Sequence, residues 1–260
     1  MRMFPIRLPL IKKGDPLLDI IIKKILKMNI KINNGDVFVI SSKVVATSQG
    51  RVVSYVNISP SRNAVALGKR YLIDPRIVEL IIKESDEVLG GIPRVLLCIK
   101  NSILMANAGI DKSNAPPNHV VLLPERPEEW AEDFRKSIYD LFKVKVGVII
   151  SDSRTQPLRL GNVGLALAVS GFEPVIDCRG EKDIYGRTLK ITWLAIADNL
   201  ASAAEILMNK SRKNAVVLIK DAPITLTDRK IRLTDMCISP KECMYMRIFN
   251  KWREERINSY

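Results

Sequence analysis

The stretch Val146-Gly-Val-Ile-Ile-Ser-Asp-Ser-Arg154 decides the fold class, because an apolar run ends there directly in polar side chains. A short apolar run without alternating polar positions predicts a strand that is buried on both faces, here over residues 144–151. A second run of this kind, residues 37–40, ends in Ser41, Ser42 and Lys43. Stretches with helical apolar spacing separate such runs. We therefore expect an α/β protein with mixed sheets and flanking helices.

Working outward from these two strands gives the remaining expected elements. A strand over residues 94–100 has a hairpin partner at 103–107, and the Gly- and Ala-rich stretch 161–170 fits helix or strand, of which we favour helix. Residues 116–127 carry four prolines and predict an irregular crossing loop. Helices are predicted over residues 15–28, 61–71, 75–85, 128–141 and 198–208, and further strands over 188–195 and 215–220.

The chain of 260 residues has a net charge of +13 and is long enough for one large domain or two small ones. A Lys- and Ile-rich composition typical of hot-growing organisms explains this charge most simply. Binding of small polyanions is the next interpretation, and nucleic-acid binding the third. With one histidine and no C-x-x-C pair, neither zinc nor a disulfide framework is expected. No apolar run reaches membrane-spanning length, so we expect a cytoplasmic protein without a membrane partner.

Three polar clusters follow predicted strands, which is where α/β proteins place their ligand sites. Ser41, Ser42 and Lys43 could hold phosphate, although an ordinary turn fits equally well. Residues 107–114 contain Asp111, and residues 151–154 contain Asp152; either carboxylate could hold magnesium or could simply cap a turn. No Walker A or G-x-G-x-x-G motif occurs, so a nucleotide would need another scaffold.

A fourth cluster is a charged turn at residues 179–187. Arg179 and Arg187 flank it, and either guanidinium could clamp an anion through two hydrogen bonds. The alternative is a hairpin that is simply exposed to solvent.

Several of these segments occur together in the order of one known family. The chain contains LPLI, GDVFVISSKVV, ESDEVL, ANAGIDKSN, VGVIISDS, KDIYGRTLKIT and IADNLASAAEILM. In these motifs it resembles the archaeal ligases that add L-glutamate to coenzyme F420-0. NAGID-x-SN and KD-x-YGR are the specific ones. The resemblance runs from Leu8 to about Lys220. We therefore expect a catalytic region at residues 1–220, with a possible crossing near 115–127, and a helical extension at 221–260.

The resemblance implies an amide-bond-forming ligase of the gamma-glutamyl ligase fold, assembled as an intertwined homodimer. The family uses GTP and a divalent ion, magnesium or manganese and possibly with potassium, to phosphorylate a carboxylate of the deazaflavin phosphodiester F420-0. The amine of L-glutamate then attacks the acyl phosphate. No nucleic acid takes part in this reaction.

The resemblance also implies roles for individual residues. It places Asp111 and Asp152 at the catalytic centre as metal ligands, joined by Ser153. Arg159 and Arg187 are candidates for binding the acceptor substrate. The expected nucleotide-binding residues are Leu8, Pro9, Leu10, Ile11, Ser42, Lys43, Asn114 and Met208.

The chain departs from the family pattern at three places. Thr47 stands where the family carries a lysine, and residues 155–161 lack its Gly-Arg pair. Lys210 stands where an acidic residue helps to hold a second metal ion, so we expect one ion per subunit. The alternatives are a diverged paralogue that ligates another amino acid to another carboxylate, a protein that only binds nucleotide or deazaflavin, and a nucleic-acid binder.

Overall fold

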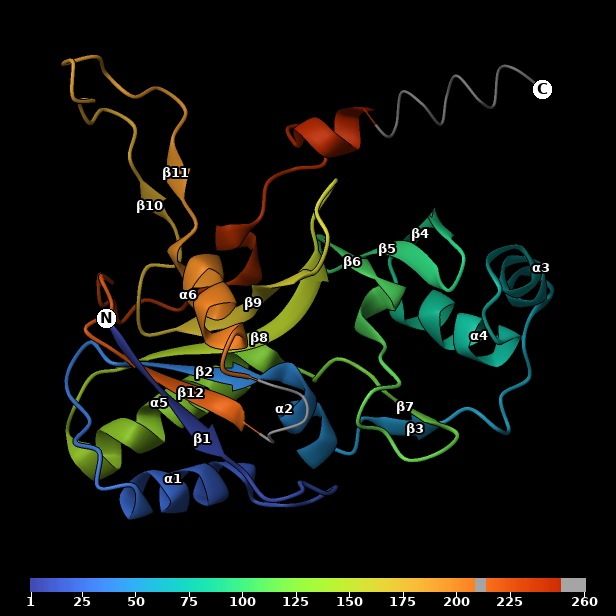
Figure 1. Ribbon diagram of the computed structural model, residues 1–260, viewed down its shortest axis with the longest axis horizontal. Coiled ribbons are helices and arrows are strands. Elements are labelled where there is room, and N and C mark those ends of the chain that lie inside the picture. Colours follow the sequence, from blue (N-terminus) through green and yellow to red (C-terminus); the bar gives the residue numbers. More distant parts are fainter. Residues whose placement is uncertain (209–213, 249–260) are drawn as a thin grey trace.

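A computed structural model describes residues 1–208 and 214–248 of the chain. Its largest element is a five-stranded mixed sheet with the strand order β1-β12-β2-β8-β9 (Figure 1). The two central strands, β2 and β8, run parallel, and the other neighbours in this sheet run antiparallel. The five strands are β1 (Arg2–Arg7), β2 (Val37–Ser41), β8 (Gly147–Thr155), β9 (Asn162–Ser170) and β12 (Asn214–Lys220).

Helices cover both faces of this main sheet, as the continuous apolar strands require. Side chains alternate along β2: Phe38 and Ile40 belong to the core under α1 (Leu17–Lys27) and α5 (Pro127–Phe142). Val37 and Val39 belong to the core under α6 (Ile196–Glu205). A strand buried on both sides in this way is held firmly, so the polar residues at its end have fixed positions.

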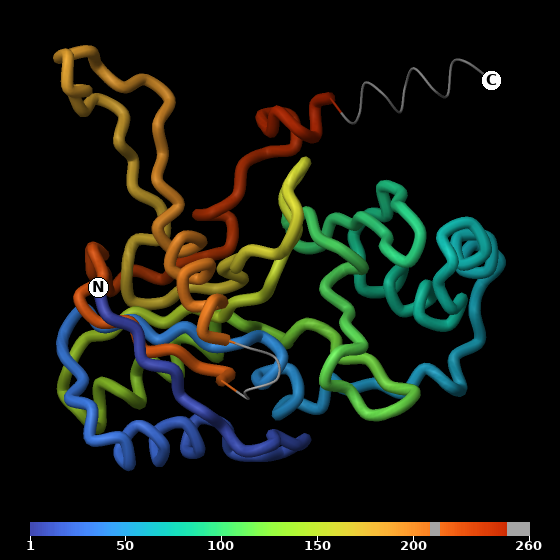
Figure 2. Tube along the Cα trace, viewed as in Figure 1, coloured from blue at the N-terminus to red at the C-terminus, as the bar shows by residue number. Residues whose placement is uncertain are grey.

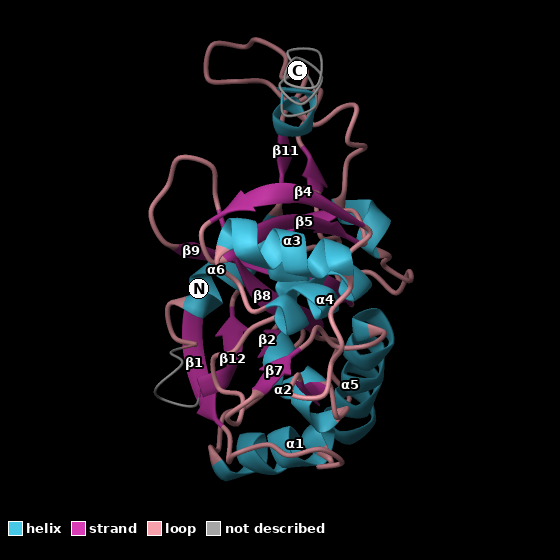
Figure 3. Cartoon of the chain, turned by 90° about the vertical axis from the view of Figure 1, so that its right-hand side faces the viewer, coloured by secondary structure: helices cyan, strands magenta, loops and turns pink. Residues whose placement is uncertain are grey.

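A second part of the chain lies beside the main sheet (Figures 1 and 3). Its three-stranded antiparallel sheet packs on two helices around a separate apolar core that includes Val78, Ile81 and Leu96. The short helix Ser42–Ser48 leads the chain out of the main sheet, and a two-stranded ribbon of Val52–Ser54 and His119–Val121 joins this part to it. The elements are α2 (Ser42–Ser48), β3 (Val52–Ser54), α3 (Arg62–Tyr71), α4 (Pro75–Glu84), β4 (Glu87–Ile92), β5 (Val95–Lys100), β6 (Ile103–Ala106), η1 (Asn107–Gly109) and β7 (His119–Val121).

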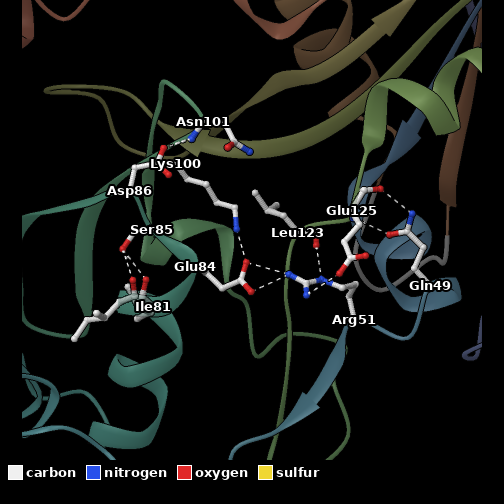
Figure 4. A network of polar contacts seen from close by, with 11 residues as sticks. Gln49, Arg51, Ile81, Glu84, Ser85, Asp86, Lys100, Asn101, Leu123 and Glu125 are labelled. Carbon is white, nitrogen blue, oxygen red and sulfur yellow. Dashed lines mark hydrogen bonds and ion pairs between the residues drawn. The ribbon is translucent and has the colours of Figure 1, made fainter.

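Arg51 joins the chain around the β3–β7 ribbon to the end of α4 through a network of polar contacts (Figure 4). Its guanidinium donates to both carboxylate oxygens of Glu84 at the end of α4, at 2.9 and 3.0 Å. The same group donates to the carbonyl of Leu123 at 3.1 Å and pairs with Glu125. Lys100 of β5 also contacts Glu84. Although burial works to raise the pKa of Glu84, the two cations keep it below its ordinary value.

Residues 176–194 form an arm that projects away from the main sheet (Figure 2). Only its base is a regular ribbon, in which β10 (Ile176–Asp177) pairs with β11 (Trp193–Leu194). Near the base, Arg179 stacks on Trp193 with 4.2 Å between guanidinium and ring centre. Farther out, Ile184 and Ile191 are 92% and 86% exposed. The arm thus displays apolar side chains to solvent.

The predicted helices at residues 15–28, 61–71, 75–85, 128–141 and 198–208 are all confirmed within a few residues. The helix favoured over residues 161–170 is wrong, because β9 occupies this stretch. Its small residues serve close packing instead: a Cβ atom at Gly164 would lie 2.4 Å from backbone atoms of Ala201 on α6. The strand predicted over 188–195 is reduced to Trp193–Leu194 at the base of the arm, because residues 188–192 lie farther out, beyond the β10–β11 ribbon.

The first residues after β12 pack against the rest of the protein. Leu226 pairs with Phe172 in an isolated bridge, Ile231 is buried, and η2 (Leu233–Met236) follows. The helical extension predicted over 221–260 is wrong for residues 221–243, which form turns, loops and η2. Residues 244–248 are helical, and residues 249–260 lie outside the described residues. Within residues 1–208 and 214–248, no helix is long and apolar enough to cross a membrane.

Candidate functional site

A cavity of about 470 Å³ opens where the two central strands of the main sheet end. Because β2 and β8 are parallel, β2 ends at Ser41 beside Ser151, and β8 continues from there to Thr155. The antiparallel strands β1 and β12 bring residues 8–11 and Asn214 to the same edge, since Arg7 pairs with Asn214. The cavity is lined by Leu8, Pro9, Leu10, Ile11, Ser41, Lys43, Val44, Thr47, Asn114, Val121, Ser151, Asp152, Ser153, Glu205, Met208, Asn214 and Ala215.

Most of the residues expected to hold nucleotide meet at this cavity. The segment 8–11, Lys43, Asn114 and Met208 all line it, although they lie far apart in the sequence. Ser42 does not line it: this residue begins α2 and is only 2% exposed. The cavity therefore has an apolar side formed by the N-terminal segment and a polar side formed by the strand ends.

The expected metal ligands Asp152 and Ser153 line the polar side. They lie near the end of β8, and one Asp152 oxygen accepts a 2.8 Å hydrogen bond from the backbone amide of Ser153. Ser151, the preceding residue, contacts the sulfur of Met208 at 3.9 Å. Arg154 instead faces α6, with its guanidinium 3.8 Å from Asp198. This strand end thus presents a carboxylate and two hydroxyls together.

Asp111 is not among the residues that line the cavity, but Lys43 joins it to the cavity wall. The Lys43 ammonium forms an ion pair with Asp111 Oδ2 and lies 3.0 Å from Ser113 Oγ. Ser113 donates to Asp111 twice, from its hydroxyl at 2.6 Å and from its backbone amide at 2.7 Å. Burial acts to raise the pKa of Asp111, but these donors lower it below its ordinary value. Asp111 is therefore held as a carboxylate.

The backbone around Asp111 explains this placement. Asp111 exchanges both backbone hydrogen bonds with Val121, at 3.1 and 2.8 Å. Val121 in turn pairs with Val52 in the β3–β7 ribbon, which follows α2 in the chain. The ribbon therefore brings Asp111 back to the helix that carries Lys43.

The oxygen donors at this edge fit a hard divalent cation. Asp152, Ser153, Asn114 and, behind Lys43, Asp111 supply only oxygen ligands from side chains, as magnesium and manganese prefer. In the part of the chain that the structure describes, no three His, Cys, Asp or Glu residues gather into a complete metal cage. Such a donor set suits an ion that also binds water and substrate phosphate.

Sequence reasoning did not single out several residues that line the cavity. Glu205 ends α6 one turn before Met208, whose amide donates to the Glu205 carbonyl at 3.1 Å. Helical spacing from Met208 would have indicated it. Thr47, noted in the sequence only as a departure from the family pattern, also lines the cavity; it lies one turn after Lys43 on α2 and donates to the Lys43 carbonyl at 2.7 Å. The other residues that were missed are Val44, Val121, Asn214 and Ala215, three of which are apolar and carry no polar signal in the sequence.

Two expected substrate residues lie elsewhere. Neither Arg159 nor Arg187 lines the cavity. Arg159 lies in the exposed turn between β8 and β9, and Arg187 lies in the arm, where its guanidinium is 5.9 Å from the Tyr185 ring centre. The charged turn 179–187 is the exposed hairpin considered as the alternative. Lys210 lies outside the described residues, between Met208 and Asn214.

Comparison with known proteins identifies the family of this chain. The family model described as F420-0:Gamma-glutamyl ligase matches residues 5–221. A protein of Methanopyrus kandleri named coenzyme F420:L-glutamate ligase is 38% identical over 210 residues, which cover 80% of this chain and 81% of the relative. Proteins of the same name from Methanocaldococcus jannaschii and Archaeoglobus fulgidus are 39% and 36% identical, covering 81% and 80% of this chain and 84% and 82% of the relatives. The chain therefore belongs to the F420-0:gamma-glutamyl ligase family.

Proposed function

We propose that this chain is a ligase that joins L-glutamate to the carboxylate of the deazaflavin coenzyme F420-0, using GTP. The observation that carries the proposal is the cavity at the ends of β2 and β8. It gathers residues from the N-terminal segment, α2, β8 and the α6–β12 connection, among them most of the positions that the resemblance assigns to nucleotide and metal. Relatives named coenzyme F420:L-glutamate ligase cover four fifths of the chain, which supports the same reaction.

In this proposal the cavity binds the nucleotide. The apolar segment 8–11 contacts the base and ribose, while Lys43 and Asn114 on the polar side bind phosphate oxygens. The positive charge of Lys43 has the sign that a transferring phosphoryl group needs. A basic chain with net charge +13 also attracts an anionic nucleotide and an anionic acceptor.

We propose that Asp152, Ser153 and Asp111 hold a magnesium or manganese ion against the triphosphate. When bound, such an ion neutralises charge on the transferring phosphoryl group. The residues of the chain orient the two reactants. A carboxylate oxygen of F420-0 attacks the terminal phosphorus and GDP leaves. The glutamate amine then attacks the acyl carbon, phosphate leaves, and the nitrogen loses its proton to solvent. Stabilising charge on the phosphoryl group is the main contribution that such a site makes.

We also propose a homodimer of the gamma-glutamyl ligase fold. Leu158 and Leu160 at the β8–β9 turn are fully exposed, and Ile184, Tyr185 and Ile191 of the arm are largely exposed. Exposed apolar side chains gathered on projecting segments indicate a protein partner. Arg159 and Arg187 belong to these same segments and lie outside their own cavity, so a second copy is the natural place for them to act.

The decisive experiment is a ligation assay with purified protein, F420-0, L-glutamate, GTP and manganese, followed by mass spectrometry. We expect a product heavier by one glutamyl residue and release of GDP. Asp152→Asn should lose both product formation and manganese-dependent nucleotide binding, whereas Asp19→Asn on the exposed face of α1 should retain them. Nucleotide binding without product formation from F420-0 would instead support a diverged paralogue or a protein that only binds its ligands.

A further inference from the structure

Lys43 lies between the cavity and Asp111 and contacts both. It lines the cavity, and its ammonium is paired with Oδ2 of Asp111. The side chains are 19% and 33% exposed, respectively. Because α2 begins at Ser42, Lys43 lies in the first turn of this helix, and the buried strand before it fixes the position of the helix. The ion pair is therefore part of the wall that separates Asp111 from the cavity.

The donors around Asp111 leave its two oxygens well engaged. Oδ2 receives the Lys43 ammonium and the Ser113 hydroxyl, and Oδ1 receives the Ser113 amide. Ser113 Oγ also accepts from Lys43 at 3.0 Å, so the lysine, aspartate and serine side chains all contact one another. A divalent cation that used Oδ2 would have to replace the ammonium, because two cations at one oxygen repel each other strongly in a partly buried place.

We infer that Lys43 is an exchangeable counter-ion for Asp111, which a divalent metal ion displaces only when nucleotide phosphate is present to receive the lysine. This rests on the proposed function, since it assumes that the cavity binds a nucleotide and a metal together. Phosphate in the cavity offers Lys43 an alternative partner, and the vacated carboxylate oxygen then becomes a ligand for the ion. Each ligand therefore increases the affinity for the other, as linkage requires.

The exchange gives Lys43 a role that a static phosphate contact lacks. Metal without nucleotide competes with a tethered ammonium and binds weakly. Nucleotide without metal must pull Lys43 away from a partly buried carboxylate, which then loses this counter-charge, and this is also unfavourable. Only the pair of ligands satisfies Asp111 and Lys43 at once. The site is thereby selective for the metal–nucleotide complex over either component.

Calorimetric titration of manganese, with and without a non-hydrolysable GTP analogue, tests this inference on the full chain. Lys43→Met should bind manganese without nucleotide more tightly than the unmodified protein, on the order of tenfold. The analogue should then improve manganese affinity much less than it does in the unmodified protein. Lys43→Arg keeps the charge and should preserve the coupling, which also shows that the fold tolerates changes at this position.

Lys112→Met is the matched control, because it removes the same charge from the neighbouring segment while its ammonium lies 5.8 Å from the Tyr55 ring centre. It should change manganese affinity by less than twofold. Equal manganese affinity in Lys43→Met and the unmodified protein would refute the exchange, as would an equal effect of Lys112→Met. If either occurs while the unmodified protein still binds manganese and analogue together, the proposed function stands. Failure of the unmodified protein to bind the analogue and manganese together would refute both.

Discussion

Arg51 and Glu84 form a two-point ion pair that joins the end of the α2–β3 connection to the end of α4. Both nitrogen–oxygen distances are close to 3 Å, and the two side chains are only 21% and 18% exposed. Such a pair is favourable mainly as a unit, because removal of one partner leaves the other charge partly buried. Arg51 also donates to the Leu123 carbonyl, so it fixes the chain just after the Asp111–Val121 bridge.

We expect Arg51→Ala to destabilise the protein by about 2–3 kcal/mol in urea-induced unfolding, since Glu84 would keep only Lys100 as a counter-charge. Arg126→Ala is the control, because its ion pair with Glu129 is exposed on both sides and should contribute less than about 1 kcal/mol. An Arg51→Ala loss no larger than that of the control would show that the junction does not depend on this pair.

Glu132 gives a prediction about pH. Two donors from Arg135 at 2.8 Å, then the Ser170 hydroxyl at 2.6 Å, outweigh burial and lower the pKa of Glu132 from 4.5 to about 2. Lys136 also lowers this pKa. Because the pKa in the folded protein is depressed, the carboxylate stabilises the fold fully above about pH 4.5. This contribution is lost as the pH falls from 4.5 towards 2.

Glu132→Gln should therefore cost about 1–2 kcal/mol at pH 7, after solvent screening is allowed for, and progressively less on acidification. Urea unfolding at a series of pH values would measure the difference. Glu129→Gln on the same helix is the control, since its Arg126 partner is exposed, and it should show a small, nearly constant difference. A Glu132→Gln penalty that stays unchanged down to pH 3 would contradict the assigned partners.

Gly164 packs against α6, and this close packing gives a prediction about the cavity. A Cβ atom there would meet the backbone of Ala201 at 2.4 Å, and backbone cannot move aside as a side chain can. Gly164→Val should push α6 away from β9 and cost about 2–3 kcal/mol. Since α6 ends at Glu205, which lines the cavity, nucleotide affinity should fall as well.

Asn162→Val places the same side chain at the exposed start of the same strand and should change stability by less than about 0.5 kcal/mol. Differential scanning calorimetry and nucleotide titration would separate the two variants. If the two variants were equally stable, β9 and α6 could move apart without lowering the free energy of unfolding.

The contrast between β8 and β9 shows what the sequence could predict. The apolar run before Asp152 needs burial on both faces, and this requirement alone predicted a central strand with a polar end. The stretch that forms β9 is equally apolar. Its small residues are needed because α6 packs closely against it, and a local sequence pattern carries no information about that tertiary contact. The helix prediction therefore failed where tertiary packing set the residue type.

The candidate site divides in the same way. Lys43 and Asp152 were each predicted to follow a buried strand, where α/β proteins place ligand sites, and the parallel pairing of β2 with β8 brings both to the cavity wall. The pairing of Lys43 with Asp111 was not predicted, since 68 residues separate them and the β3–β7 ribbon that joins them is short. Arg187 matched a family motif, yet the arm carries it away from the cavity of its own chain.

The arm supplies the last prediction, which concerns the proposed homodimer. Ile191 is 86% exposed and Tyr185 is 79% exposed on a segment that packs little against its own body. If these side chains bury themselves against a second copy, replacing both with charged residues adds a desolvation penalty to the lost apolar contact. Tyr185→Glu with Ile191→Glu should therefore shift the protein to monomers at micromolar concentration, measured by sedimentation equilibrium.

Leu141→Glu is the matched control, because Leu141 is also exposed, at 59%, but lies on α5 beneath the main sheet. It should leave the association constant unchanged. Circular dichroism should show native helix content in all variants, since neither set of substitutions touches the core. A mass of one chain for the unmodified protein at all concentrations, or a dimer that survives the double substitution in the arm, would exclude this surface as the interface. Because Arg187 lies between the two substituted positions, loss of the dimer should also weaken acceptor binding while nucleotide affinity at the cavity is retained.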